Sequence, residues 1–359
     1  MVSSSPLKRM SPVQVLNLPP LKACVLLAVA GLVAVTAILA YLLQTGLAWR
    51  LATDVPNDRS LHIRPTPRVG GWGIVPVVMV LIWLSAPELW MSAAVAGLLA
   101  ALSQIDDRCG LPARMRFTGH LVAVVSLVFA YRTPVPWWEL ALIAFLLLWL
   151  VNLYNFMDGA DGLAGGMALF GFGGYAYAAL SVNYPDVQLA AASAVISGAV
   201  AGFLLFNFHP ARVFLGDAGS IPLGFLAGAL GYWGWRGGVW PVWFPALTFA
   251  PFIGDASVTL LKRLWRGERF WHAHREHYYQ RMVRSGLGHA TTALIWYWVM
   301  VAGIMLAIVA LRFSPFYQWM AVFSWALVLV AMGYWVDRRW RGYVARSTLP
   351  KGLDANDQT

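Results

Sequence analysis

The chain has 359 residues, of which 59% are hydrophobic and 12% are charged, and its formal net charge is +10. Soluble domains carry about 25% charged residues, so this composition excludes a soluble globular protein and indicates an integral membrane protein. In a soluble protein the positive charge would suggest nucleic acid binding. Here we interpret it as the excess of Lys and Arg on the cytoplasmic side of a membrane protein.

An apolar stretch of about 20 residues can cross a bilayer, and eleven candidates follow one another along the chain. They are residues 23–46, 71–86, 89–105, 118–131, 138–153, 163–182, 188–206, 219–235, 240–261, 292–311 and 317–336. We therefore predict an all-α, polytopic membrane bundle with about 10–11 transmembrane helices. A polar segment (1–22) precedes this transmembrane core (23–336), and a basic tail (337–359) follows it.

The Lys and Arg residues predict the orientation of the bundle. If the connection after the first span is cytoplasmic, that side carries twenty of these cations and the other side six. We therefore expect an external N-terminus and a cytoplasmic C-terminus. The long polar connections 48–70, 106–117, 152–162, 207–219 and 262–291 then all face the cytoplasm. Because most acidic residues lie in these connections, we expect one composite site on that side.

Three acidic clusters stand at the ends of expected spans: Asp106-Asp107, Asp158 with Asp161, and Asp217. Ionisable groups next to hydrocarbon are costly and usually functional. Carboxylates near one another suit Mg²⁺, which takes oxygen ligands, usually one or two carboxylates plus substrate phosphates. The clusters therefore predict a divalent-metal and phosphate site at a bilayer surface.

Several of these residues allow a second interpretation. Asp217 alone would serve equally well as a helix N-cap, but the other two clusters favour a ligand. Asp106 and Asp107 point about 100° apart on a helix, so we expect one near the metal and the other as a base or orienting group, unless both are simply solvated. Arg114 and Arg116 either neutralise a phosphate or are ordinary cytoplasmic cations.

A histidine-rich loop contains His272, His274, Arg275 and His277. Imidazoles could bind zinc, but the arginine beside them disfavours a cation. Histidine and arginine together suit an anion such as pyrophosphate, and a plain basic surface loop is the remaining alternative. Asp255 lies inside the ninth span, where an ionisable group normally faces the interior with a partner; a structural hydrogen bond is the simplest role for it.

Five motifs, in order across residues 54–285, resemble the polyprenyl-phosphate N-acetylhexosamine-1-phosphate transferase family (glycosyltransferase family 4), which contains MraY, WecA and WbpL. They are Asp-Val-Pro-Asn-Asp-Arg-Ser-Leu-His with Pro-Thr-Pro-Arg-Val-Gly-Gly (54–71), Asp106-Asp107, Asn-Phe-Met-Asp-Gly-Ala-Asp-Gly (155–162), Phe-Leu-Gly-Asp-Ala-Gly-Ser (214–220) and His-Ala-His-Arg-Glu-His-Tyr-Tyr-Gln-Arg (272–281). Each motif is weak alone, and the ordered set is specific. The first and last motifs look most like the WbpL and WecA branch, and the run of adjacent histidines expected of MraY is absent.

The resemblance implies transfer of N-acetylhexosamine-1-phosphate from a UDP-N-acetylhexosamine to undecaprenyl phosphate. The products would be an undecaprenyl-diphospho-sugar and UMP, in the initiating step of an envelope glycan such as O-antigen. It further implies Mg²⁺ as cofactor, with Mn²⁺ as a substitute, and a bacterial inner membrane location with the active site facing the cytoplasm. No nucleic acid partner is expected, and the choice between monomer and homodimer is left open.

Carried over by position, the resemblance also implies a role for individual residues. Asn155 and Asp217 would hold the metal, and Asp217 would be catalytic together with Asp106 and Asp107, which would prepare the lipid phosphate. Asp161 would hydrogen-bond uracil, Phe214 would stack on it and Asp158 would lie nearby. The phosphate groups would be held by Arg116, His274, Arg275 and His277.

Two other functions fit parts of the pattern. One is an MraY-like transfer of a phospho-muramoyl-pentapeptide, which the histidine loop disfavours. The other is a multi-span transporter, but transporters place ionisable residues near the bilayer midplane, whereas most acids here lie at one surface. The aromatic-rich spans (14% Phe, Trp and Tyr) fit interfacial belts and are also consistent with a groove for a prenyl chain.

Overall fold

The computed structural model describes residues 18–56, 61–62, 64–268 and 274–347. Most of the expected polar segment 1–22, the end of the expected tail 337–359, and His272 in the histidine-rich loop therefore lie outside the described residues. The division into these segments remains a prediction.

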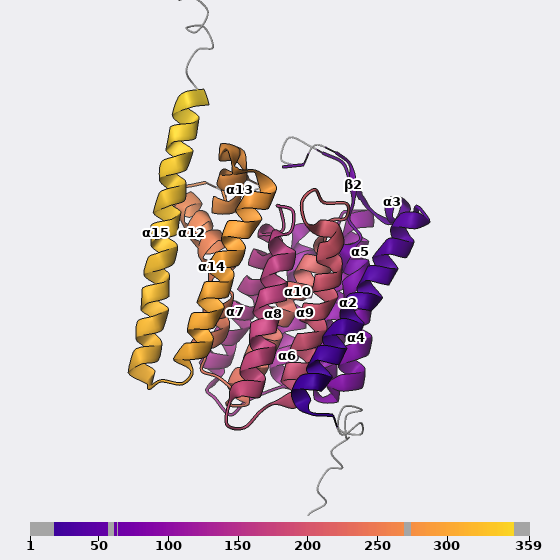
Figure 1. The fold of residues 1–359 in the computed structure, drawn as a ribbon, viewed down its shortest axis with the longest axis vertical. Helices are drawn as coiled ribbons and strands as arrows, with labels where there is room; N and C mark the ends of the chain where they lie inside the picture. The colour runs from indigo at the N-terminus through magenta and orange to yellow at the C-terminus, as the bar shows by residue number, and fades with distance from the viewer. Residues whose placement is uncertain (1–17, 57–60, 63, 269–273, 348–359) are drawn as a thin grey trace, which may run out of the picture.

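The described chain is almost entirely helical, which confirms the all-α prediction (Figure 1). The long helices are α2 (Pro20–Gln44), α4 (Gly70–Ser85), α5 (Trp90–Cys109), α6 (Ala113–Ala130), α7 (Trp137–Phe156), α8 (Leu163–Ser181), α9 (Val187–Asn207), α10 (Asp217–Arg236), α12 (Ala250–Trp265), α14 (Gly288–Ala310) and α15 (Pro315–Ser347). Short helices are α3 (Leu47–Leu51), α11 (Trp243–Thr248) and α13 (Tyr278–Met282), with a 3-10 turn η1 (Pro87–Leu89) and a π-helical turn η2 (Val283–Leu287). Strands β1 (Thr53–Asp54) and β2 (Thr66–Pro67) pair antiparallel.

Eight of the described helices are long and apolar enough to cross a membrane, so this is a multi-pass membrane protein. Three of the eleven predicted spans are not among the eight. Helix α4 has only 16 residues, and α10 is rich in glycine and tryptophan, which contribute little hydropathy. The stretch 240–261 forms two helices, α11 and α12, instead of one. Pro251, the second residue of α12, has no N–H to continue the hydrogen bonds of α11, so the helix is interrupted at Phe249.

The long helices run side by side and alternate in direction, so that every second connection lies at the same end of the bundle (Figure 1). Helix α2 begins at the lower end in this view, whereas α3, β2, α13 and the end of α15 lie at the upper end. The first and last helical residues are therefore at opposite ends of the bundle. Which side is cytoplasmic remains a prediction.

Small residues allow the helices to pack closely. A side chain at Gly198 of α9 would place its Cβ 2.0 Å from the carbonyl oxygen of Ala28 in α2, and one at Gly202 would meet Leu32 at 2.5 Å. Such small-residue contacts are typical of membrane helix interfaces. Helix α9 is thereby buried in the centre of the bundle, while α15 lies at its outer face and is little buried.

Candidate active site

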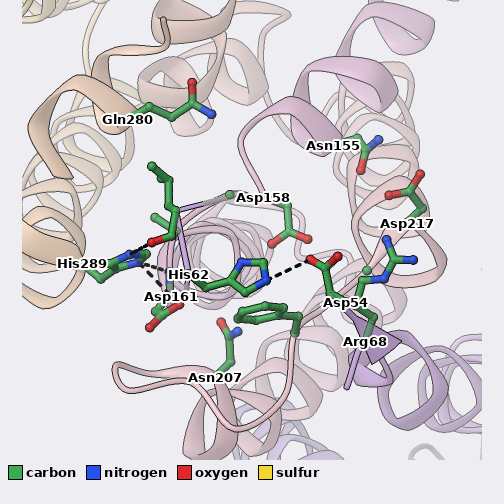
Figure 2. A pocket seen from close by; sticks show the side chains of 15 residues that line it. Asp54, His62, Arg68, Asn155, Asp158, Asp161, Asn207, Asp217, Gln280 and His289 are labelled. Atoms are coloured by element: carbon green, nitrogen blue, oxygen red, sulfur yellow. Dashed lines mark hydrogen bonds and ion pairs between the residues drawn. The ribbon is translucent and has the colours of Figure 1, made fainter. Parts of the chain in front are cut away.

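A pocket of about 310 Å³ opens at the upper end of the bundle (Figure 2). Its lining comes from the connections after α3, α7 and α9 and from the segment containing α13 and the start of α14. Five residues that the sequence singled out line this single pocket: Asn155, Asp158, Asp161, Phe214 and Asp217. The expected convergence of separate polar connections is therefore present.

The first connection is hydrogen-bonded to the Phe-Leu-Gly-Asp motif. The N–H of Phe214 donates to the carbonyl of Pro67 (2.8 Å), and the N–H of Gly70 donates to the carbonyl of Phe214 (2.9 Å). A Cβ at Gly71 would lie only 2.4 Å from the carbonyl carbon of Ala218, so this approach requires glycine. The pairing places Arg68 at the pocket wall close to Asp217 (Figure 2).

Asn155 and Asp217 lie together at one end of the pocket (Figure 2). The hydroxyl of Ser220 donates to Asn155 Oδ1 (2.6 Å), which ties the end of α7 to the start of α10. The N-cap of α10 is Gly216, and the Asp217 side chain makes no capping hydrogen bond. The N-cap interpretation of Asp217 is therefore wrong, and its carboxylate faces the pocket instead.

Asp158 lies beside this pair, in the turn after α7. Burial raises the pKa of Asp158 to about 7, and the negative charge of Asp217 adds to the shift. Two neighbouring carboxylates disfavour each other's ionisation unless a cation lies between them. The end of the pocket formed by Asn155, Asp158 and Asp217 is thus an electrostatically suitable place for a cation.

The other end of the pocket is built around Asp161, which is 8% exposed. His209 Nδ1 lies 2.6 Å from Asp161 Oδ2, and the N–H of Ala211 donates to the same oxygen (3.2 Å). The N–H of Asp161 itself donates to His289 Nδ1 (3.2 Å). Phe214 lines the wall nearby, with its ring edge-on to His62. This end therefore combines a fixed carboxylate with an aromatic ring.

The adjacent acids at the end of α5 have different partners, as expected from their angular separation. Asp106 accepts hydrogen bonds from Arg116 (3.1 Å) and from the N–H of Leu111 (2.7 Å). Asp107 pairs with Arg68 at 3.5 Å, and Arg68 lines the pocket. The pocket lining does not include Asp106, Asp107 or Arg116. Asp107 is connected to the pocket through its ion pair with Arg68. Asp106 and Arg116 pair with each other at the periphery.

The histidine-rich loop is positioned by Asp255, whose side chain is fully buried. Its carboxylate accepts hydrogen bonds from the N–H groups of Tyr278 and Tyr279 (both 2.9 Å) and lies 3.2 Å from His277 Nδ1. The prediction that Asp255 faces the interior with a partner is confirmed. Thr259 Oγ1 donates to the same carboxylate (3.2 Å).

His274, Arg275 and His277 do not line the pocket. Burial and the neighbouring His277 lower the pKa of His274 to about 4, so His274 is neutral at pH 7 and offers hydrogen bonds instead of charge. Within the described ranges, the group of side chains spaced to hold a metal ion is Asp161, His209 and His289, and it includes none of the loop histidines. The expected contact of the loop with a phosphate group remains a prediction.

Six polar pocket-lining residues were not predicted as site residues: Asp54, His62, Arg68, Asn207, Gln280 and His289. The first three belong to the first motif, which was recognised without a role for its individual side chains. Asn207 accepts from the N–H of Gly162 (3.0 Å) and so fixes the acidic turn. Gln280 belongs to the last motif, which was also recognised without a role for this side chain. Nothing in the local sequence around His289 marks it, because its place in the pocket depends on how α14 packs.

The comparisons with known proteins agree with this site. Residues 89–234 match the model of "Glycosyl transferase family 4". A probable undecaprenyl-phosphate N-acetylglucosaminyl 1-phosphate transferase of Bacillus subtilis is 28% identical over 78% of this chain and 82% of its own length. A phospho-N-acetylmuramoyl-pentapeptide-transferase of Geobacillus thermodenitrificans is 34% identical, but over only 44% of this chain and 58% of its own length.

A third relative combines broad coverage with a slightly higher identity. The decaprenyl-phosphate N-acetylglucosaminephosphotransferase of Mycobacterium tuberculosis is 30% identical over 75% of this chain and 80% of its own length. The family match at residues 89–234 includes the connections after α7 and α9, which line part of the pocket, and three of the five ordered motifs lie within it. From the shared motifs, the membrane bundle and these relatives, the chain belongs to the polyprenyl-phosphate N-acetylhexosamine-1-phosphate transferase family, glycosyltransferase family 4.

Proposed function

We propose that this protein transfers N-acetylhexosamine-1-phosphate from a UDP-N-acetylhexosamine to undecaprenyl phosphate and releases UMP. The observation that carries the proposal is the single pocket lined by Asn155, Asp158, Asp161, Phe214 and Asp217 at one end of a membrane bundle. Two relatives named as N-acetylglucosamine-1-phosphate transferases align with 78% and 75% of the chain and a third with 50%, whereas a muramoyl-pentapeptide transferase aligns with 44%. This difference in coverage favours the proposed donor over a muramoyl-pentapeptide.

The two ends of the pocket suit the two ends of a nucleotide sugar. At one end, Asp161 is held by His209 and Ala211, and Phe214 offers an aromatic face. These groups would bind uracil by a hydrogen bond and by stacking. At the other end, Arg68 and the oxygens of Asn155 and Asp217 would bind the diphosphate region (Figure 2).

The donor atoms at the second end fit Mg²⁺, which prefers carboxylate and amide oxygens together with substrate phosphates. Asn155 Oδ1 accepts one hydrogen bond from Ser220 and keeps a second lone pair for a ligand. Asn155 and Asp217 would hold the ion, with Asp158 beside them. When bound, Mg²⁺ would neutralise charge on the transferring phosphate, and Mn²⁺ has a similar preference for oxygen ligands.

The remaining residues would orient the reactants. In the transfer, an oxygen of the lipid phosphate forms a bond to the phosphorus next to the sugar, and the bond from that phosphorus to UMP breaks. The lipid phosphate is already an oxyanion at neutral pH, so a strong base is not required. Asp107 would hold Arg68 through their ion pair (3.5 Å) and thereby place a positive charge next to the reacting phosphates.

An apolar groove supports the lipid acceptor. It has a volume of about 210 Å³ and lies between α7, α10, α11 and α12, lined by side chains such as Leu147, Leu150, Tyr232 and Ile253. Helix α7 continues from this groove to Asn155 in the pocket. A prenyl chain in the groove would therefore have its phosphate near the site. The charge bias along the sequence favours an active site that faces the cytoplasm of a bacterial inner membrane, as in the initiation of an envelope glycan.

The test is transfer by the purified protein in detergent. A panel of radiolabelled UDP-N-acetylhexosamines and UDP-muramoyl-pentapeptide is supplied with undecaprenyl phosphate and either Mg²⁺, Mn²⁺ or a chelator. We expect UMP and a labelled lipid product with at least one UDP-N-acetylhexosamine, dependent on the metal. A transporter would release no UMP, and preference for the pentapeptide donor would replace the proposal with the MraY-like reaction.

A further inference from the structure

Asp161 and two histidines from different parts of the chain form a cluster at one end of the candidate active site. Asp161 lies in the turn after α7, His209 follows the end of α9, and His289 is the second residue of α14. One ligand atom from each of these side chains lies within 4.8 Å of the other two. Figure 2 shows Asp161 and His289 at the opposite end of the pocket from Asn155 and Asp217. The cluster is therefore separate from the side chains expected to hold magnesium.

The distances within the cluster are close to those of a metal site. His209 Nδ1 lies 2.6 Å from Asp161 Oδ2, and His289 Nδ1 lies 3.5 Å from Asp161 Oδ1. Ligand atoms about 2.0–2.1 Å from a tetrahedral zinc ion lie about 3.3 Å from one another. The His209 side chain is 42% exposed, so it has room to turn toward an ion shared with the other two residues.

His289 has the hydrogen bonds of a metal-binding histidine. Its Nε2 lies 3.4 Å from the carbonyl oxygen of Leu61, and its Nδ1 accepts the N–H of Asp161 (3.2 Å). Nδ1 is therefore the nitrogen without a proton, and a metal ion would take its lone pair over from this long hydrogen bond. Metal-binding histidines nearly always donate their other ring N–H to a carbonyl or a carboxylate. The N–H of Ala211 orients Asp161 Oδ2 in a similar way (3.2 Å).

The charge of the pocket also favours a cation. Its described lining contains four aspartates and one arginine, namely Asp54, Asp158, Asp161, Asp217 and Arg68. A magnesium ion at the other end would neutralise only part of this negative excess. Mg²⁺ prefers oxygen ligands, whereas two imidazoles and a carboxylate suit zinc. The two ends of the pocket therefore differ in the kind of metal ion that their side chains favour.

We propose that Asp161, His209 and His289 form a second metal site, which binds Zn²⁺. The three side chains would supply three ligands and leave a fourth position for water, as in zinc sites that keep an open position. A carboxylate only accepts hydrogen bonds, so His209 Nδ1 carries a proton in the structure, and this proton would move to Nε2 when zinc binds. The site does not depend on the reaction proposed above. Bound zinc would also exclude uracil from Asp161, and this consequence alone rests on the proposed function.

Co²⁺ is the spectroscopic probe for this site. The full chain, purified in detergent without a histidine tag and stripped of metals, is titrated with Co²⁺ in excess Mg²⁺, which occupies the oxygen site. Co²⁺ with four or five ligands absorbs visible light much more strongly than six-coordinate Co²⁺. We expect a strong band that saturates at a single Co²⁺ per chain and disappears when Zn²⁺ is added. A titration without a strong band overturns the proposal.

Substitution by asparagine removes each imidazole and keeps its hydrogen bond. The amide of His209→Asn can still donate to Asp161, and that of His289→Asn can still accept the Asp161 N–H, so thermal unfolding should show a folded protein. Calorimetric titration should give at least about tenfold weaker Zn²⁺ binding in each, since even changes outside a ligand set cost about that much. His274→Asn is the matched control, because this histidine does not line the pocket. Wild-type zinc affinity in either cluster variant, or weakened binding in the control, overturns the proposal.

X-ray absorption at the zinc edge identifies the ligands without any substitution. For the wild-type chain loaded with one equivalent of Zn²⁺ in excess Mg²⁺, we expect two imidazole ligands and otherwise only oxygen. This result does not depend on how well the variants fold. A spectrum that shows sulfur ligands, or fewer than two imidazoles, contradicts the assigned ligand set and overturns the proposal.

Discussion

Asp255→Asn is the substitution that best tests how the histidine-rich loop is held. The carboxylate of Asp255 is fully buried and receives N–H groups from Tyr278 and Tyr279, one on each oxygen. Asparagine has the same shape but carries an NH₂ group in place of one oxygen. One of the two backbone N–H groups would then face another donor.

The magnitude follows from these contacts. A hydrogen bond to a charged group contributes about 1.5–3 kcal/mol, and a stranded buried N–H costs about 1–3 kcal/mol. The variant therefore loses about 3–5 kcal/mol of the hydrogen-bond free energy that holds the start of α13 in place. Lys262 and Arg281 still tether the helix to Asp337, so we expect a displaced α13 in a folded protein. Because Gln280 of α13 lines the pocket, kcat/KM should fall by about 10–100-fold, since each 1.4 kcal/mol is tenfold.

The assay is transfer from the accepted UDP-sugar at varied donor and acceptor concentrations, together with thermal unfolding in detergent. The donor KM should rise more than the acceptor KM. Thr259→Val is the matched control, because it removes only one neutral donor from the same carboxylate. It should change kcat/KM by a few-fold at most. Wild-type donor kinetics in Asp255→Asn would refute the idea that this carboxylate sets the position of the pocket wall.

Three further predictions concern the pocket itself. Asp217→Asn should lower UMP release by about 10²–10³-fold with unchanged folding. Asp186→Asn, which removes a negative charge at the opposite end of the bundle and keeps an N-cap oxygen on α9, should leave the rate intact; substantial activity in Asp217→Asn would remove that residue as a metal ligand. Asp158→Asn should raise the unfolding temperature of chelator-treated protein more at pH 8 than at pH 5. The folded-state pKa of Asp158 is raised from 3.8 to about 7, so the folded state binds the extra proton and the Asp158 contribution to stability falls as pH rises through that window; an equal difference at both pH values would contradict this account. Gly71→Ala should prevent stable expression, because its Cβ would lie 2.4 Å from the Ala218 carbonyl carbon, while Gly173→Ala, whose Cβ would have only an ordinary contact at 3.5 Å, should be tolerated.

The membrane class, the helix positions and the three acidic clusters could be read from the sequence, because each depends on local pattern. A run of about 20 apolar residues has few alternatives to a membrane helix. Carboxylates beside such runs also stand out, because an ionisable group next to hydrocarbon is costly and usually functional. Asp158, Asp161 and Asp217 were found in this way, and Asn155 and Phe214 through the resemblance of their motifs. All five line one pocket.

The parts of the site that the pattern did not reveal depend on contacts between distant segments. Arg68 looks like one of many cytoplasmic cations until the first connection pairs with Phe214 and carries Arg68 to the pocket. His289 is 128 residues from Asp161, whose N–H it accepts. His277 was expected at a phosphate, yet it is buried against Asp255, while Gln280, one helical turn later, reaches the pocket wall.

The amino-acid sequence alone determined that this chain crosses the membrane many times and gathers its acids at one surface, since hydrophobicity and charge act on each segment by itself. Only the tertiary structure decided which of two adjacent acids reaches the pocket, and which side of the histidine-rich loop faces it. Those choices depend on helix rotation and on hydrogen bonds between residues far apart in the chain, such as that from Tyr279 to Asp255. No local pattern encodes them, because the same residues on a helix turned by 100° would face a different neighbour.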